Sequence, residues 1–400
     1  MLRTNFSILV LVWITASFDF GLIGLATAQE TQTDLDTSAF DPSIRVQDDL
    51  FQHVNGGWLA TARIPADKSD YGSFGKLADQ SQKQIREIIE QSAEGTHETG
   101  SDAQKVGDFY KSYMDVGAAD RKGVEPLADD IAFIEQLSSK LETWTHFGTL
   151  SQIGVNNPIG VYVSQDAKNS SQYIVHLIQS GFTLPDRDYY LRDDDENSAA
   201  ARQALRAYIA KLFELAEIDN GHIAAEQIFE LEKQLARISW PRVQLRDAEK
   251  RYNKRTDDEL QAMTPSLDWN ELLHSTGIPD VTEVNVTTPS FFEEFEPIFE
   301  NTSLEIWKRY LQFRLLDAYA PYLSEPFVEA HFQLHEHQLG GVPSRQPRWK
   351  HAVKAIAGEG AGDFGALGEV AGRLYVEKHF KPEAKARMEE AKRRAAAKRA

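Results

Sequence analysis

The sequence predicts a mainly α-helical protein that carries one small β-hairpin. Beyond residue 42, most of the chain repeats its apolar side chains with helical spacing, and several of these runs begin with helix-capping residues. Only the segment 159–179 breaks the helical period. The chain has 400 residues, of which 42% are hydrophobic, so it can bury a large core but exceeds the usual size of one domain. We therefore expect two lobes or domains.

The first clear helix follows the start signal Ser101-Asp102. Its apolar side chains stand at i, i+3, i+4 and i+7, namely Val106, Phe109, Tyr110 and Tyr113. Pro126 occupies the first turn of the next predicted helix, where proline is favoured. Long helical patterns cover residues 199–217 and 223–239, and Trp240-Pro241 ends the second of them.

Two capping boxes predict further helix starts. In each box a threonine precedes a glutamate by three residues, so that each side chain can bond the backbone N–H of the other. Thr256 and Glu259 form the first pair, and Thr302 and Glu305 form the second. We expect a helix to begin at each threonine.

The one β element is predicted near 159–179. Ile159–Ser164 and Gln172–Gln179 are rich in β-branched and aromatic residues, and Asp166-Ala167-Lys168-Asn169 between them has the composition of a turn. We find no internal repeat and no series of buried parallel strands, so the fold class remains mainly α.

The N-terminus has the features of a secretory signal peptide over residues 1–28. Arg3 supplies a positive charge, Ile8–Ile14 is an unbroken apolar run, and Ala26-Thr27-Ala28 is a small-residue cleavage site. A membrane anchor is the alternative, but Asp19 interrupts the apolar stretch, so we expect no stable membrane span. Residues 29–42 are polar and are predicted to form a flexible leader.

Composition narrows the compartment and the partners. The chain has no Cys, which excludes disulfides, thiol catalysis and Cys-ligated metal; in a secreted protein it suggests a bacterial periplasm. We expect a periplasmic or secreted protein. The net charge of −18 argues against nucleic acid as a partner. Residues 381–400 are basic and are interpreted as a solvated helix or frayed tail rather than a nucleic-acid-binding segment.

The stretch HFQLHEH, which begins at His331, resembles a zinc-binding helix without completing its motif. The H-E-x-x-H pattern places two His on one helix face beside a Glu. With His331 and His335 as the pair, Phe332 stands where the Glu belongs. The two other registers of the motif, including the inverted H-x-x-E-H form, fail at Leu339 and at Gln333.

A helix capped by Ser324 and stopped by Gly340-Gly341 places His331 and His335 within its apolar arc, with Glu336 on the other side. Three interpretations remain: hydrogen-bonded core histidines, a structural metal site and a catalytic zinc site. The first is favoured, because buried polar groups are normally hydrogen-bonded. The pair lacks an adjacent carboxylate base, and spacing identifies no third ligand.

Gly360–Gly365 matches G-x-G-x-x-G, the pattern of dinucleotide-binding loops. That fingerprint requires a preceding strand and a surrounding βαβ unit. The residues before it, 349–357, are predicted to be helical instead. We interpret this segment as a plain glycine-rich connection.

Three blocks resemble the neprilysin-like family of zinc metallopeptidases. Asp48–Leu77 reads DDLFQHVNGGWLATARIPADKSDYGSFGKL, and Gly181–Leu191 reads GFTLPDRDYYL. The third block joins PRWK, at Pro347–Lys350, to GRLYVEKHF, at Gly372–Phe380. With their order and spacing, the resemblance covers nearly everything from residue 41 to about 390.

The resemblance implies two mostly helical lobes around a cavity, with this chain as the large helical lobe. It also implies zinc in the complete enzyme and peptides as its substrates. It also implies that the family's H-E-x-x-H helix, third ligand and remaining catalytic segments lie C-terminal to the last matched block. None of these motifs occurs in this sequence. We therefore expect residues 43–380 to be the N-terminal region of such a peptidase, truncated before H-E-x-x-H and inactive alone. We expect no catalytic residue, no metal ligand and no cofactor bound by this chain; the substrate-binding residues stay unassigned.

One segment departs from the family. In some relatives, charged side chains within the stretch that matches Asp70–Gly75 help to line a primed-side subsite. Here this stretch contains no basic residue, so the resemblance implies only scaffold roles for Tyr71, Gly72 and Phe74.

Two other functions remain open at this stage. The chain could be a periplasmic peptide-binding or scaffold module retained without the catalytic half. It could also be one half of a split peptidase, whose partner is a separate chain carrying the zinc lobe. In the complete family enzyme, the Asp41–Gly75 segment is expected to pack against that lobe, so exposed apolar surface is expected here.

Overall fold

The computed structural model describes residues 37–358, 365–380 and 382–397. The chain divides into two compact units, Met1–Arg63 and Ile64–Ala400. The signal peptide expected at 1–28 and the first part of the expected leader lie outside the described residues. Among the described residues, no helix is long and apolar enough to cross a membrane.

The described part of the first unit contains a 3₁₀ helix, η1 (Thr37–Ala39), and one α-helix, α1 (Leu50–Leu59). The carboxylate of Asp49 caps α1 by accepting the N–H of Gln52 at 2.9 Å, which satisfies one of the free donors at the helix start. Gly56 lies against the side chain of Asp41, where a Cβ would come within 2.7 Å of its Cβ. A glycine is therefore required for this close approach.

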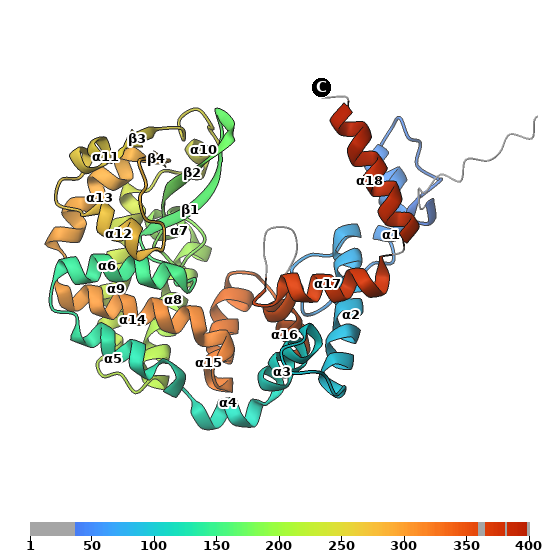
Figure 1. Ribbon diagram of the computed structural model, residues 1–400, viewed down its shortest axis with the longest axis horizontal. Helices are drawn as coiled ribbons and strands as arrows, with labels where there is room; N and C mark the ends of the chain where they lie inside the picture. Colours follow the sequence, from blue (N-terminus) through green and yellow to red (C-terminus); the bar gives the residue numbers. More distant parts are fainter. Residues whose placement is uncertain (1–36, 359–364, 381, 398–400) are drawn as a thin grey trace, which may run out of the picture. The chain divides into compact units, whose positions relative to one another are not determined.

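The second unit is mainly helical, as predicted (Figure 1). Its α-helices are α2 (Ser73–Glu94), α3 (Asp102–Met114), α4 (Val116–Lys122), α5 (Ala128–Gln136), α6 (Lys140–Gln152), α7 (Asp188–Leu191), α8 (Glu196–Leu215), α9 (Gly221–Ile238), α10 (Arg242–Leu245), α11 (Asp257–Met263), α12 (Trp269–Ser275), α13 (Pro289–Asn301), α14 (Leu304–Tyr319), α15 (Glu325–His331), α16 (Arg348–Ala357), α17 (Gly368–His379) and α18 (Pro382–Ala397). Two short 3₁₀ helices, η2 (Glu125–Leu127) and η3 (Ala320–Tyr322), and a π-helix, η4 (Phe332–Gln338), complete the set.

The predicted hairpin is confirmed and belongs to a larger sheet. The strands β1 (Ile159–Asp166) and β2 (Asn169–Gln179) pair antiparallel, and Asp166 pairs with Asn169 at the turn. Two short strands were not predicted, β3 (Lys254–Thr256) and β4 (Glu283–Val286). The sheet order is β1-β2-β4-β3, with β2 and β4 parallel and β3 and β4 antiparallel.

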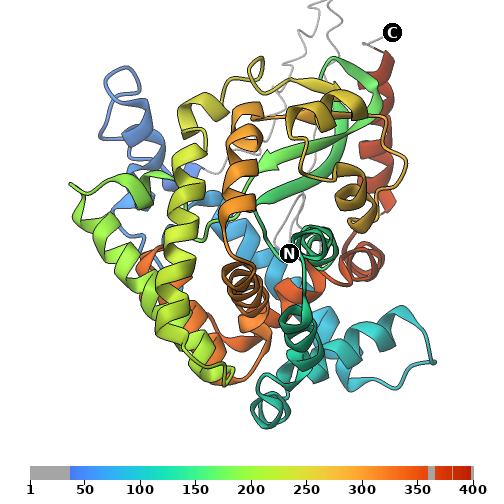
Figure 2. The ribbon, with the colours of Figure 1, turned by 90° about the vertical axis from the view of Figure 1, so that its left-hand side faces the viewer.

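The larger core of the second unit is built around aromatic side chains. Trp144 on α6, Trp269 on α12 and Phe299 on α13 are almost fully buried, and their rings meet mainly edge to face. Such contacts add about 0.5–1.5 kcal/mol per pair beyond the burial of area. The long helices α8 and α9, which Figure 2 shows side by side, pack their apolar faces into the same core. This core holds the hairpin and α14 in place.

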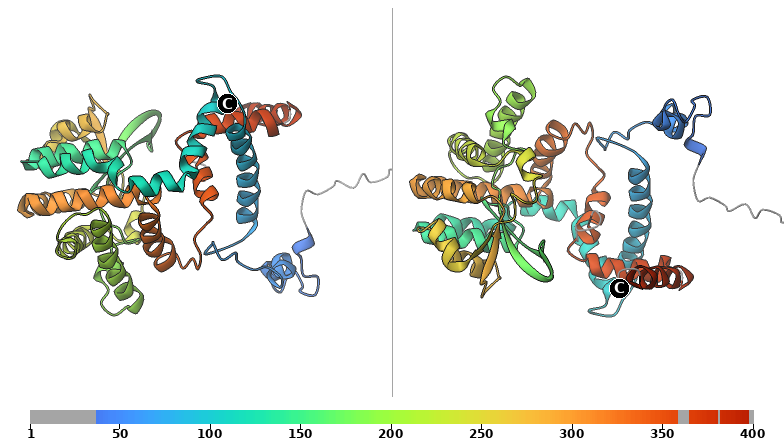
Figure 3. Two further views of the ribbon diagram at one scale, coloured as in Figure 1. Left: turned by 90° about the horizontal axis from the view of Figure 1, so that it is seen from below. Right: turned by 90° about the horizontal axis from the view of Figure 1, so that it is seen from above.

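A second, smaller core lies between α2, α3, α16 and α17. Its buried members include Ile89, Val106, Val353 and Ile356. The guanidinium of Arg86 on α2 stacks over the ring of Trp349 on α16, 4.3 Å from its centroid. Figure 3 shows α2 and α16 alongside each other. The unit therefore has two hydrophobic centres rather than one.

The capping predictions have different outcomes. The box at Thr256 is confirmed, because its hydroxyl accepts the N–H of Glu259 and the Glu259 carboxylate accepts the N–H of Thr256. The box at Thr302 is wrong. Thr302 ends α13 and donates its hydroxyl to the carbonyl of Ile298 at 2.7 Å, so Ser303 caps α14 instead.

The end of the described chain is helical. The last helix, α18, exposes nearly all of its side chains from residue 382 to residue 394. It thus has the form of a solvated helix, one of the two forms expected for the basic tail.

Candidate functional site: an Asp–His–His cluster beside a buried ionic network

His331 and His335 lie one turn apart and present their rings to each other. Pro326 stands in the first turn of α15, and the helix reaches its last residue at His331. The backbone then widens into the π-helix η4, which contains His335. The two rings stack with their centroids 4.2 Å apart and their planes 29° apart. The predicted i, i+4 pair is therefore formed, at the point where the helix changes its hydrogen-bond register.

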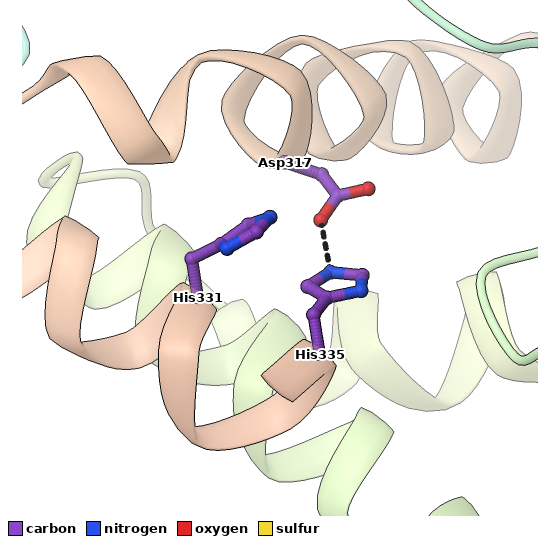
Figure 4. Close-up of side chains that lie close together, drawn as sticks. All are labelled: Asp317, His331 and His335. Atoms are coloured by element: carbon purple, nitrogen blue, oxygen red, sulfur yellow. Dashed lines mark hydrogen bonds and ion pairs between the residues drawn. The ribbon is translucent and has the colours of Figure 1, made fainter. Parts of the chain in front are cut away.

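Asp317 on α14 is the third member of the cluster (Figure 4). Its Oδ1 atom lies 2.9 Å from Nε2 of His335. The same oxygen accepts a hydrogen bond from the hydroxyl of Tyr208 on α8, also at 2.9 Å. Three different helices, α8, α14 and η4, thus place these groups together.

Burial and neighbouring charges lower the pKa values of two of these groups, Asp317 and His331. Burial alone raises the pKa of Asp317, but the hydrogen bond and charge of His335, followed by the charge of Arg314, lower this pKa to about 2. Burial, together with repulsion from His335, lowers the pKa of His331 to about 4. At neutral pH the site therefore holds a carboxylate beside a neutral His331 imidazole.

A buried ionic network continues from Asp317 into the core. The Arg314 side chain is 2% exposed, and its Nη1 lies 3.8 Å from Oδ2 of Asp317 and 3.6 Å from Oε1 of Glu232, which is fully buried. The same nitrogen donates to the hydroxyl of Thr183 at 2.8 Å, and Nε donates to the carbonyl of Asn156 at 3.0 Å. One buried cation is thus balanced by two carboxylates and further acceptors, as a buried charge requires.

The family-like block Gly181–Leu191 is tied to this network. The hydroxyl of Tyr190 donates to Oε2 of Glu232 at 2.5 Å and accepts the N–H groups of Thr183 and Leu184 at 3.1 and 3.0 Å. Burial, followed by the neighbouring Glu232 charge, raises the pKa of Tyr190 well above its usual value, so the hydroxyl keeps its proton. The block therefore organises the scaffold around Glu232.

Gly181 in this block also has a steric role. Its φ of +93° is disfavoured for residues with a side chain, and a Cβ there would lie 2.6 Å from Cα of Pro158. Its carbonyl accepts the hydroxyl of Tyr310 at 2.7 Å. No other residue type fits this position without moving the backbone.

The first and third family-like blocks meet in the second unit. Nζ of Lys350 lies 2.5 Å from Oδ2 of Asp67, and both side chains are largely buried, at 14% and 18% exposure. Nearby, Lys68 pairs with Asp79 at 2.5 Å. A cavity of about 620 Å³ opens beside these pairs, lined by Lys68, Leu77, Asp79, Ile85, Lys350 and Val353 among others.

The structure shows which of the candidate sites suggested by the sequence have the surroundings that their function would need. Of the glycine-rich match, only Gly365 lies within the described residues, and the helix α16 precedes it where a dinucleotide fold would need a strand. Phe332, which replaces the Glu of a zinc-peptidase helix, is 5% exposed. Asp317 was missed; its only signal was an acidic residue at the end of a helix whose residues 310–316 are all buried.

The cluster does not fit a peptidase zinc centre. Such a centre needs a carboxylate base that activates the metal-bound water. Phe332 fills that position, and the nearby buried side chains of Glu232 and Asp317 are engaged with Arg314, Tyr190 and Tyr208. What the residues do offer is two imidazoles and one carboxylate, a donor set for metal binding.

Known proteins share this architecture and sequence. Human endothelin-converting enzyme-like 1 is 28% identical over an alignment of 367 residues, which covers 88% of this chain and 46% of that protein. The solved structure of zinc metalloprotease Zmp1 from Mycobacterium tuberculosis, in complex with an inhibitor, superposes with a TM-score of 0.80 and 37% identity, covering 89% of this chain and 53% of the other. PepO from Lactobacillus rhamnosis is similar in fold, with a TM-score of 0.67 and 22% identity, covering 87% of this chain and 54% of that chain.

The sequence model of the N-terminal region of peptidase family M13 matches residues 46–393. Fold and sequence together define the chain as a neprilysin-like metallopeptidase N-terminal region. The chain belongs to peptidase family M13. It spans about half the length of the relatives it matches, 46% of the human protein and 53% of the mycobacterial chain.

Proposed function

We propose that this chain is the N-terminal, cavity-forming region of a secreted zinc metalloendopeptidase that hydrolyses peptides, and that it is inactive alone. The family match and the similarity to Zmp1 support the metallopeptidase relationship. The observation that carries the proposal of inactivity is that the 400 residues contain no H-E-x-x-H motif. Peptide hydrolysis by zinc needs metal ligands and a carboxylate base together, and the Asp317 cluster lacks the base.

We propose that the catalytic lobe, which carries the zinc site, covers exposed apolar side chains of the second unit. Phe74 is 90% exposed, Leu77 is 61% exposed and Ile64 is 57% exposed, although water is an unfavourable neighbour for all three. They lie in or beside the first family-like block. We propose that the catalytic lobe, either as a continuation of this protein or as a separate chain, packs against them.

Secretion is part of the proposal and rests on residues 1–28. Mass spectrometry of the protein recovered from its native host should show a mature N-terminus at Gln29, in a periplasmic or extracellular fraction. A chain that keeps Met1 in the cytoplasm would contradict this part.

Complementation tests the peptidase proposal directly. The purified chain should not cleave short peptides with added Zn²⁺. Addition of a separately expressed H-E-x-x-H-bearing C-terminal half from a relative should produce chelator-sensitive cleavage. Such cleavage by the chain alone would overturn the proposal of inactivity.

The same assay tests the covered surface. The double variant Phe74→Ser/Leu77→Ser should reduce complementation at least tenfold, because it removes apolar area from the proposed interface. Tyr173→Ser is the matched control, because Tyr173 is 73% exposed but lies on the hairpin. Equal complementation by the double variant and the control would show that the catalytic lobe packs elsewhere.

A peptide-binding module is the second candidate, supported by the 620 Å³ cavity between the first and third blocks. Calorimetry with a mixed peptide library would detect such binding. Lys350→Met, at the cavity wall, should then weaken it, whereas a folded chain that binds no peptide would exclude this role.

A further inference from the structure

Asp317, His331 and His335 form a group whose ligand atoms all lie within 4.8 Å of one another. The three side chains converge from α14 and from the α15–η4 segment, and all are partly buried. His335 and Asp317 already touch at 2.9 Å, whereas the His331 ring forms no hydrogen bond among the described residues and packs against the rings of His335 and Tyr208. A ring nitrogen without a hydrogen-bond partner, beside a carboxylate and a second imidazole, is an arrangement that suits a set of metal ligands.

The donor types select the class of ion. Two imidazoles and one carboxylate suit Zn²⁺ and its neighbours in the first transition row, whereas Mg²⁺ and Ca²⁺ prefer oxygen ligands throughout. An ion midway between two atoms 4.8 Å apart would lie about 2.4 Å from each, against about 2.0–2.2 Å for zinc bonds to nitrogen and oxygen. Small side-chain rotations close that difference.

The surroundings of Asp317 are suitable for a ligand. The Tyr208 hydroxyl donates to Oδ1 at 2.9 Å and so orients the carboxylate, in the manner of outer-shell partners at metal sites. Arg314 lies 3.8 Å from Asp317 and would repel a cation, but it lies closer to Glu232, at 3.6 Å, which balances its charge. The repulsion between Arg314 and a bound cation would therefore be opposed by two carboxylates, Glu232 and Asp317.

A cavity lies close to the cluster. A cavity of about 610 Å³ is lined by Tyr208 and Ala330, and by Leu334 and His337 of the π-helix. Tyr208 thus contacts Asp317 with its hydroxyl and also forms part of the cavity wall. The cavity therefore borders a residue that touches the cluster.

We propose that Asp317, His331 and His335 bind one divalent transition-metal ion of the Zn²⁺ type, which joins α14 to the α15–η4 segment in a non-catalytic role. This departs from the expectation of no metal ligand in the chain, because sequence spacing did not bring Asp317 to the histidines. The proposal does not depend on the peptidase assignment, since the cluster lacks the base that hydrolysis needs.

Calorimetric titration of Zn²⁺ into the chelator-stripped, dialysed 400-residue chain tests the site. We expect one ion per chain at the tightest site. His331→Gln and His335→Gln should each weaken that binding at least tenfold, because each removes one of three ligands. His337→Gln is the matched control. His337 lies in the same π-helix, but its Nδ1 contacts the Val342 carbonyl at 2.9 Å. The zinc affinity of this variant should change less than twofold.

Thermal unfolding supplies a second readout, independent of binding heats. Zn²⁺ in large excess over its Kd should raise the Tm of the unaltered chain by about 3 °C, and Mg²⁺ should not. The zinc shift should be lost in His331→Gln and kept in His337→Gln. The metal-free Tm of each variant is its own reference, because His331→Gln also removes the ring contacts with His335 and Tyr208.

The outcomes separate clearly. Loss of tight binding and of the Tm shift in both cluster variants, with retention in His337→Gln, supports the site. Zinc affinity unchanged in His331→Gln and His335→Gln, or the absence of a one-to-one complex in the unaltered chain, overturns it.

Discussion

The hydroxyl of Tyr190 donates to Oε2 of Glu232 across 2.5 Å while it accepts two backbone N–H groups from its own block. This contact joins the Gly181–Leu191 segment to α9 in the interior of the larger core. It also keeps a carboxylate hydrogen-bonded where water does not reach it. The role of this family-like block in the fold is therefore structural.

Tyr190→Phe should lower the free energy of unfolding by about 1–3 kcal/mol, because it leaves Glu232 without one donor and the N–H groups of Thr183 and Leu184 without this acceptor. Urea titration followed by circular dichroism measures the change. Tyr189→Phe is the control, since the Tyr189 hydroxyl forms no hydrogen bond among the described residues and should change stability by less than about 0.5 kcal/mol. Equal losses in both variants would contradict the structural role of the Tyr190 hydroxyl.

Gly181→Ala should destabilise the fold more than Gly154→Ala. Both glycines have positive φ, +93° and +77°, so both variants carry backbone strain. Only at Gly181 would the new Cβ also meet Cα of Pro158, at 2.6 Å, whereas Gly154 has open space. We expect the difference between them to be about 1–3 kcal/mol in chemical denaturation. No difference would mean that the contact with Pro158 relaxes freely.

Lys350→Met should lower the free energy of unfolding by about 1–3 kcal/mol, because it leaves the largely buried Asp67 carboxylate without its charged donor. Lys211→Met removes an ion pair of similar length, 2.8 Å, whose side chains are 45% and 70% exposed, and should cost less than about 1 kcal/mol. Thermal unfolding of both variants compares them. A loss as small for Lys350 as for Lys211 would show that the pair adds nothing beyond a surface contact.

The Asp67–Lys350 pair should also respond to acid. Burial raises the pKa of Asp67, but the hydrogen bond and charge of Lys350 lower it further, so the net shift is downward from 3.8. A depressed carboxyl pKa contributes stability that is present above pH 3.8 and is lost as the pH falls through the folded-state value. The stability difference between the unaltered chain and Lys350→Met should therefore shrink below about pH 4.

His351 on α16 should make the fold less stable between pH 6.5 and pH 4. Burial, followed by the charges of Lys354, Arg345 and Arg348, lowers its pKa from 6.5 to about 4, and its Nε2 is buried without a partner among the described residues. The unfolded chain binds the proton first, so the neutral ring contributes stability that is full above pH 6.5 and declines towards pH 4, by up to about 3 kcal/mol.

His351→Gln should flatten this part of the stability–pH curve, and denaturant unfolding at several pH values would show it. The exposed His274 provides the comparison, and His274→Gln should leave the curve unchanged. A curve that keeps its full slope in His351→Gln would assign the acid sensitivity to other groups.

Sequence patterns predicted the elements whose signals are local. The hairpin at 159–179 and the capping box at Thr256 depend on neighbouring residues, and both are confirmed. The strands β3 and β4 have three and four residues, too few to show a period, and they form by pairing across the fold. At Thr302, the preceding helix captured the threonine hydroxyl, which local spacing could not reveal.

Of the site, the sequence predicted only the histidine pair, again because its signal is local. His331 and His335 are one turn apart, so helical geometry alone brings them together. Asp317 is on another helix, and only the packing of α14 against α15 and η4 places its carboxylate 2.9 Å from His335. The metal-binding potential of the cluster therefore arises from tertiary structure, while the histidine pair arises from sequence.

The parallel pairing of β2 with β4 has a consequence for the order of folding. It aligns Val175 with Val284, residues that are separated by most of the helices of the larger core. The hairpin closes a loop of a few residues, whereas the β2–β4 ladder must close a loop of more than a hundred, and long-range closure slows folding. During synthesis, the hairpin can form as soon as it leaves the ribosome. The edge of β2 that pairs with β4 stays open until β4 is made, and an unpaired strand edge in a nascent chain favours aggregation.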